Sequence, residues 1–157
     1  MSTPTALVPG VLALLSSYTS IEDPVADLRA ACVGAVERLG PRVRVVASEA
    51  TGGSGARVAA ALVAAAGAEV VAAGETGVLV VGNGSAKRTE KAPGHLDERA
   101  AGFDEALRRS FAGIDPVLAE ELWADTACLA GLPSLADAEV RYDDAPFGVQ
   151  YWVALWP

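Results

Sequence analysis

The chain has 157 residues, of which 52% are hydrophobic and 20% charged, enough apolar material for one packed domain over residues 1–157. Its 12 Lys and Arg against 20 Asp and Glu give a formal net charge of −8. A field of this sign repels phosphate backbones and anionic lipid, which excludes nucleic acid and membrane surfaces as partners. The apolar stretch 6–15 lacks a basic flank and contains Pro9 and Gly10, so it predicts neither a signal peptide nor a transmembrane helix.

The N-terminal half alternates strand and helix patterns. In chain order the sequence predicts a strand at 6–8, a helix capped by Asp23 with Pro24 at its first position and ended by Gly40, a strand at 43–47, a helix at 56–66, and strands at 68–72 and 76–81. The helix at 56–66 is apolar nearly all round, which predicts that both of its faces are covered. The short Gly74-Glu75 connection predicts that the last two strands are antiparallel neighbours or an edge pair.

The C-terminal half adds helices and two more strands. A helical stripe is formed by Leu96, Ala100, Phe103, Leu107 and Phe111. Residues 116–130 predict one or two further helices with Trp123 as a core anchor, and strands at 140–142 and 149–155 flank a turn-rich stretch at 143–148. The whole pattern predicts an α/β fold, a three-layer sandwich with a mixed, mostly parallel central sheet and helices on both faces.

The two cysteines and the single histidine limit the chemistry. Cys32 and Cys128 lie far apart within apolar helical patterns, so the sequence predicts buried free thiols in a reducing, cytoplasmic setting. His95 is the only histidine, and a solvent-facing or helix-capping role is favoured over proton transfer.

Ligands of open α/β sheets gather outside the carboxyl ends of strands, and three predicted loops lie there: 48–55, 82–91 and 143–148. In the first loop Gly52, Gly53, Ser54 and Gly55 precede a helix and form a candidate anion nest. The Lys-Ser/Thr pair of a nucleotide-binding loop is missing after its last glycine, so a tight turn is favoured over nucleotide binding.

The second loop is long and charged. Its candidate ligand-binding residues, with the histidine just named, are Asn83, Ser85, Lys87, Arg88 and Glu90. Mixed charges are typical of a solvated, self-paired surface, whereas structureless stretches of this length are usually functional lids or disordered segments. The length of the loop therefore favours a function more than its charge does.

The third loop contains Asp143 and Asp144 directly after a predicted strand. Two adjacent carboxylates there could bind a cation or include one carboxyl with a raised pKa. Aspartate that forms a turn before Pro146 is the favoured alternative.

The segment GNGSAKRTEKAPGHLDERAAGFDEAL resembles a motif of the LigB-like superfamily, which contains the class III extradiol dioxygenases. STPTALVPG and AEVRYDDAPFGVQYWVALW are similar to the first-strand and closing segments of its actinobacterial members. The agreement of the middle segment runs through Gly82, Ser85, Arg88, Thr89, Ala92, Pro93, Gly94, Asp97, Arg99, Phe103 and Asp104.

This resemblance implies an α/β fold whose active members hold Fe(II) between two histidines and a carboxylate and open catechol rings with dioxygen. The first metal histidine falls at Thr3, and the acid/base histidine falls at Ala86. No histidine follows the strand 43–47, and only the carboxylate has a survivor, near Asp144. A site with two imidazoles cannot be built from a chain with one histidine, so no metal site and no cofactor are expected.

The leading hypothesis is therefore a catalytically degenerate LigB-like domain that binds a small ligand or serves as an assembly subunit, including as a homo-oligomer. An enzyme of different chemistry is the alternative. It would bind an anionic small molecule with Lys87, Arg88 or Lys91 and use Glu90 or Asp144 as base. The aromatic residues of YWVALW could line an interface, although strand alternation favours Trp152 and Trp156 in the core.

Overall fold

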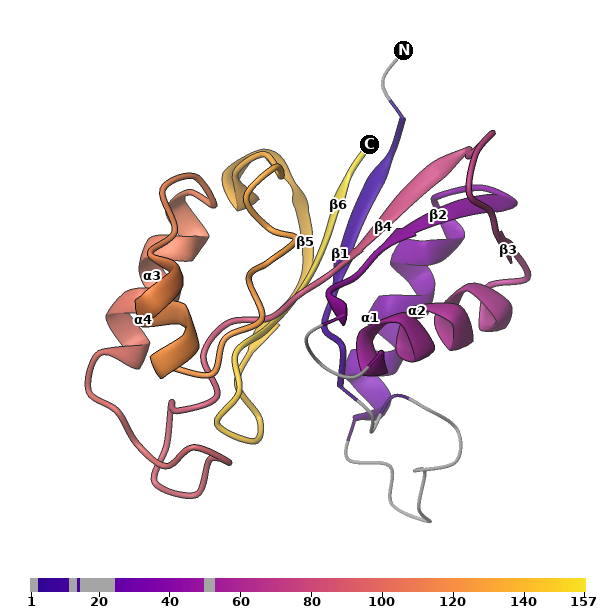
Figure 1. Ribbon diagram of the computed structural model, residues 1–157. Helices are drawn as coiled ribbons and strands as arrows, with labels where there is room; N and C mark the ends of the chain where they lie inside the picture. Colours follow the sequence, from indigo (N-terminus) through magenta and orange to yellow (C-terminus); the bar gives the residue numbers. More distant parts are fainter. Residues whose placement is uncertain (1–2, 12–13, 15–24, 50–52) are drawn as a thin grey trace.

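The protein is a three-layer α/β sandwich with helices on both faces of one sheet (Figure 1). The computed structural model describes residues 3–11, 14, 25–49 and 53–157. Helices α1 (Ala26–Glu37) and α2 (Ser54–Ala65) pack on one face, and α3 (Ala100–Arg109) and α4 (Pro116–Glu121) on the other. This architecture confirms the predicted fold class.

The central sheet has the strand order β3-β2-β4-β1-β6-β5. Its strands are β1 (Thr5–Val8), β2 (Arg42–Val46), β3 (Glu69–Val70), β4 (Gly77–Val81), β5 (Glu139–Asp144) and β6 (Tyr151–Trp156). The first four are parallel, β6 runs antiparallel to β1, and β5 runs antiparallel to β6. The carboxyl ends of the parallel strands therefore point the same way, downward in Figure 1, and the β5–β6 turn lies at that edge too.

The alternation of apolar residues along the strands divides the core into two halves. Ala6 and Val8 face α1 and α2, whereas Leu7 faces α3 and α4. Trp152 is fully buried and meets Phe111 edge to face at 6.4 Å between ring centroids, and Trp156 is buried as well. The prediction that both tryptophans of YWVALW face the core is confirmed.

Two predictions about the N-terminal half are wrong. β3 and β4 are not antiparallel neighbours: both pair in parallel with β2, one on each side, and β3 is the edge strand. Helix α2 is covered on one face only, because its outer alanines and one charged residue are exposed. Alanine is tolerated on both sides of a helix, so its hydropathy cannot tell the buried face from the solvent face. The outer residues are Ala56, Arg57, Ala60, Ala64 and Ala65.

Three predictions about the C-terminal half also change. Leu96 is 52% exposed and precedes α3, so it does not belong to the buried stripe. Trp123 is no core anchor: it follows α4 with a positive φ of 57° and its side chain is 55% exposed, while Leu122 takes the buried position. Asp143 and Asp144 belong to β5 rather than to the turn after it.

The cysteines differ in environment. Cys32 is buried in α1 as predicted, and burial raises its pKa to about 12. Cys128 lies in a turn, not in a helix, and is only partly buried. The predicted cap residues Asp23 and Pro24 lie outside the described residues. None of the helices in the described part of the chain has the length and apolarity that a membrane crossing requires.

Candidate functional site

The polar loop, residues 82–99, is held by backbone hydrogen bonds on both sides rather than being structureless. On one side Gly84 N–H donates to Gln150 O at 2.9 Å, and Gln150 N–H donates back to Ser85 O at 2.9 Å. On the other side Asn83 and Asp125 exchange two hydrogen bonds at 3.0 and 3.1 Å. The start of the loop thus crosses the sheet edge beyond β1 and ties two distant segments together.

Close approach at this crossing requires glycine. A Cβ at position 84 would lie 2.5 Å from Asp104 Oδ1 and 2.9 Å from Gln150 Cβ. Distances below about 3 Å are not tolerated between such atoms, so Gly84 allows the loop to lie against the segment before β6. Glycine at position 84 therefore serves the packing of the loop against this segment.

Beneath the loop lies a charged cluster that we call the Asp104 network: Arg88, Asp104, Arg108, Asp143 and Gln150. Arg88 donates to Asp104 Oδ2 at 3.1 Å and to Gln150 Oε1 at 3.0 Å. Arg108 grips Asp143 with two hydrogen bonds of 2.8 Å and also donates to Gln150 Oε1 at 3.1 Å. Gln150 Nε2 donates to Asp143 Oδ1 at 2.7 Å. One buried amide thus joins two arginine–aspartate pairs.

The two carboxylates of this network are shifted in opposite directions. Complete burial raises the pKa of Asp104, against the lowering effect of the Ser85 N–H at 2.8 Å and of Arg88. Burial also acts to raise the pKa of Asp143, but the bidentate Arg108 outweighs it and the pKa is lowered. The raised-pKa carboxyl considered for the 143–148 loop is therefore not Asp143.

Most of the remaining residues predicted to bind a ligand form contacts with other residues of the chain. Ser85 is fully buried and its Oγ accepts from Lys87 N at 3.1 Å. The Lys87 ammonium lies 5.3 Å from the centroid of the Trp123 ring, within cation–π range. Asp144, the last residue of β5, accepts from the N–H of the following Ala145 at 2.8 Å. His95 has a positive φ of 60° and contacts the carbonyl of Glu90 at 3.3 Å.

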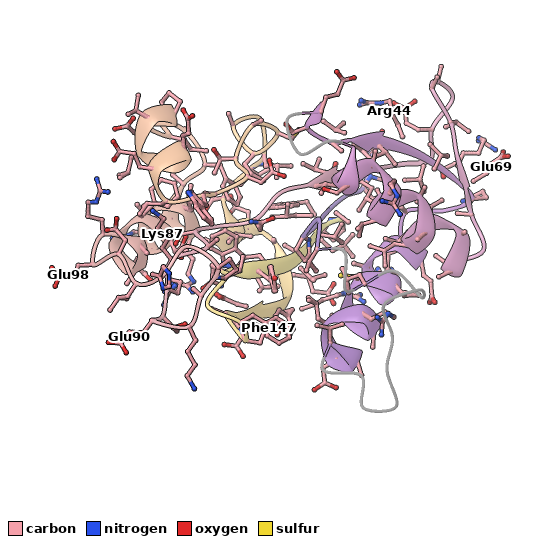
Figure 2. All side chains as sticks on the ribbon, turned by 60° about the horizontal axis from the view of Figure 1, so that its bottom comes forward. Arg44, Glu69, Lys87, Glu90, Glu98 and Phe147 are labelled. Atoms are coloured by element: carbon pink, nitrogen blue, oxygen red, sulfur yellow. The ribbon has the colours of Figure 1, made fainter. Side chains whose placement is uncertain are left out.

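The free charges of the polar loop line a hollow at its far end, which we call the Phe147 groove. It has a volume of about 570 Å³ and lies between the loop and the β5–β6 turn. Its lining residues are Thr89, Glu90, Lys91, Pro146, Phe147 and Gly148. Phe147 is 41% exposed, and no ion pair between described residues involves Glu90 or Lys91. Figure 2 shows Lys87 and Glu90 on the loop side of the molecule, far from Arg44 and Glu69.

A second hollow at this edge, the Asp125 pocket, has a volume of about 490 Å³ and joins the end of β2 to α4. Sequence analysis missed it because Asp125 stands in no motif and its partner Asn83 is distant along the chain. Its lining residues are Ser48, Pro116, Ala119, Glu120, Trp123, Ala124, Asp125, Thr126 and Ala127.

A third hollow, of about 550 Å³, opens on the sheet face beside β2 and β4, where α3 and α4 leave the sheet uncovered. Its lining includes none of the candidate ligand-binding residues. Its charged lining residue Arg44 already pairs with Glu75 at 3.0 Å. We therefore regard it as an open part of the sandwich rather than as the candidate site.

The predicted anion nest is only partly described, since Gly52 lies outside the described residues. Gly53 is the N-cap of α2 with φ 81°, and Ser54 begins the helix. A Cβ at Gly55 would lie 3.2 Å from Val81, so this glycine permits helix–strand packing. Anion binding at this position stays a prediction.

The Fe(II) site that the resemblance implies does not fit these residues. Thr3 precedes β1 at the amino edge of the sheet, whereas Ala86 follows β4 and Asp144 ends β5, both at the opposite edge. Even histidines at the matched positions would not converge on one ion. Within the described residues no three side chains of His, Cys, Asp or Glu gather as a metal site would require.

Comparison with models of known protein families, with curated proteins and with solved structures gives no match for this chain.

Proposed function

We propose that the protein is a catalytically degenerate LigB-like domain that binds a small molecule in the Phe147 groove without transforming it. The observation that carries the proposal is that charged groups which a reaction would need already form hydrogen bonds within the chain. Arg88 is bound to Asp104 and Gln150, and Asp144 caps a backbone amide. Of the groups that the alternative enzyme could use on an anionic substrate, Arg88 and Asp144 would first have to break these contacts, whereas Lys91 and Glu90 form no ion pair among the described residues.

The Phe147 groove keeps the groups that binding requires. An exposed aromatic ring and Pro146 offer apolar contact area, and Lys91 and Glu90 supply charges at the rim. Its volume of about 570 Å³ lies within the range of small-molecule sites. A ligand with an aromatic ring could pack against Phe147, and a carboxylate on the same ligand could pair with Lys91.

A suitable probe is 3,4-dihydroxybenzoate, a catechol with a carboxylate. We expect calorimetry to detect binding to the wild-type protein, and Phe147→Ala and Lys91→Ala to weaken it. Lys87→Ala, which removes a charge of the same loop outside the groove, is the matched control and should leave binding unchanged. Absence of binding by the wild-type protein would contradict the assignment of the groove.

The catalytic part is tested separately. The protein is loaded with Fe(II) and the same probe without oxygen and is then exposed to air, and the absorbance of a ring-opened product is followed. We expect no product. Product formation that depends on Asp144 would refute the proposal that the domain is degenerate, whether or not the Phe147 variants bind.

A further inference from the structure

The Asp125 pocket lies at the carboxyl ends of β2 and β4, the position where open α/β sheets bind ligands. The loops that leave β2 and β4 pass to opposite faces of the sheet, toward α2 and α3. Such a divergence opens a crevice between the strand ends. Ser48 forms one wall of this pocket, and the turn after α4 forms the other.

Asp125 is fixed in place by its backbone while its side chain is left free. Its N–H and C=O are both paired with Asn83, at 3.1 and 3.0 Å, so the residue cannot swing out of the pocket without breaking this bridge. Among the described residues, none donates a hydrogen bond to the carboxylate. Burial raises its pKa, with no opposing contribution from a donor or a cation. The pocket thus contains a partly desolvated anion that lacks a counter-ion.

The charges around the pocket are those of a cation site. Glu120 adds a second carboxylate, and Lys, Arg and His are missing from the lining residues. Lys87 lies over the Trp123 ring at 5.3 Å and forms no ion pair with Asp125 among the described residues. Beside the two carboxylates the lining residues are mostly apolar rather than further oxygen ligands, which favours an organic cation over a metal ion.

Apart from Ser48 and Thr126, the remaining lining residues are apolar. Trp123 adopts a positive φ of 57°, a conformation that bulky residues rarely take, and this turn brings its exposed ring to the pocket. Pro116, Ala119 and Ala124 complete the apolar lining. An aromatic ring beside a carboxylate is the combination that recognises an ammonium group on an apolar body.

We propose that the Asp125 pocket binds a small primary amine, with the Asp125 carboxylate as counter-ion of the ammonium group and Trp123 against its apolar body. This site is separate from the Phe147 groove, and its existence does not depend on the function proposed for that groove.

Benzylamine is the probe, with benzyl alcohol as its neutral counterpart and benzoate as the anionic one. Binding is measured by calorimetry and by quenching of tryptophan fluorescence. Trp123 is the exposed tryptophan, whereas Trp152 and Trp156 are buried. We expect benzylamine to bind about tenfold or more tightly than benzyl alcohol, as a charge-assisted hydrogen bond predicts, and benzoate not to bind.

Asp125→Asn keeps the backbone bridge and removes the charge, and it should abolish the preference for the amine. Glu98→Gln removes an exposed carboxylate of the polar loop and should leave benzylamine affinity unchanged. Affinity of the wild-type protein should fall as the pH is lowered through the raised pKa of Asp125. Equal binding of amine and alcohol by the wild-type protein, or full amine affinity in Asp125→Asn, would overturn the proposal. Phe147→Ala should not change benzylamine binding, which separates this site from the Phe147 groove.

Discussion

Removal of Arg88 tests whether the Asp104 network stabilises the fold. In Arg88→Met the buried Asp104 carboxylate would keep the Ser85 N–H at 2.8 Å but lose its cationic partner at 3.1 Å. Breaking a fully buried ion pair from one side costs about 3–5 kcal/mol. Because the Arg88 side chain is 24% exposed, water screens the pair in part, and we expect a loss of about 2–3 kcal/mol.

The loss of unfolding free energy in Arg88→Met should depend on pH. The pKa of Asp104 determines whether the loss grows or shrinks as the pH rises. In the folded protein this pKa is raised above the ordinary value of 3.8, so the native state binds a proton more readily than the unfolded state does. Stability from this group therefore falls as the pH rises from about 3.8 through the raised pKa. Without Arg88 the folded pKa rises further, so the variant should lose most stability at neutral pH and least in acid, where the carboxyl is uncharged.

Urea unfolding of both proteins at neutral pH and near the ordinary pKa of aspartate measures the difference. The expected loss at neutral pH corresponds to a Tm decrease of roughly 4–12 °C for a domain of this size. Arg57→Met, on the exposed face of α2, is the matched control and should change the stability by less than about 0.5 kcal/mol. A loss from Arg88→Met below about 0.5 kcal/mol, or one that is the same at both pH values, would refute the structural role of the pair.

Three further predictions concern the turn before β6, the thiols and a helix cap. Gly148→Ala should destabilise the protein by about 1–3 kcal/mol in urea unfolding, because φ is +75° and the new Cβ would collide with Ala92. An unchanged midpoint of unfolding would contradict this geometry. Cys32, with its pKa at about 12, should resist a thiol reagent at mildly alkaline pH until the protein unfolds, and reaction in the native state would contradict its burial. Asp115→Ala removes the acceptor of the Val117 N–H at 3.0 Å and should cost about 0.5–2 kcal/mol, whereas Asp115→Asn should retain most of the stability.

The path of the polar loop shows why contacts between residues far apart in the chain could not be predicted from the sequence. Its glycines and charges indicated a loop at a strand end, but Arg88 and Gln150 are 62 residues apart, and no periodicity relates them. The exposure of Trp123 had the same cause. A large aromatic residue after a helical pattern predicts burial, whereas Trp123 follows α4 with a positive φ and an exposed ring.

Sequence patterns alone predict the layer architecture, and one histidine is too few for the two-histidine iron site that the resemblance implies. Alternating strand and helix periods are local properties that propensity and burial enforce, and a count of one histidine needs no structure. The three-dimensional fold determines which polar residues pair with one another and which form no ion pair or hydrogen bond among the described residues. The pairing of Arg88 with Asp104 and the position of Asp125, whose carboxylate has no hydrogen-bond donor among the described residues, both depend on where distant segments meet at the sheet edge.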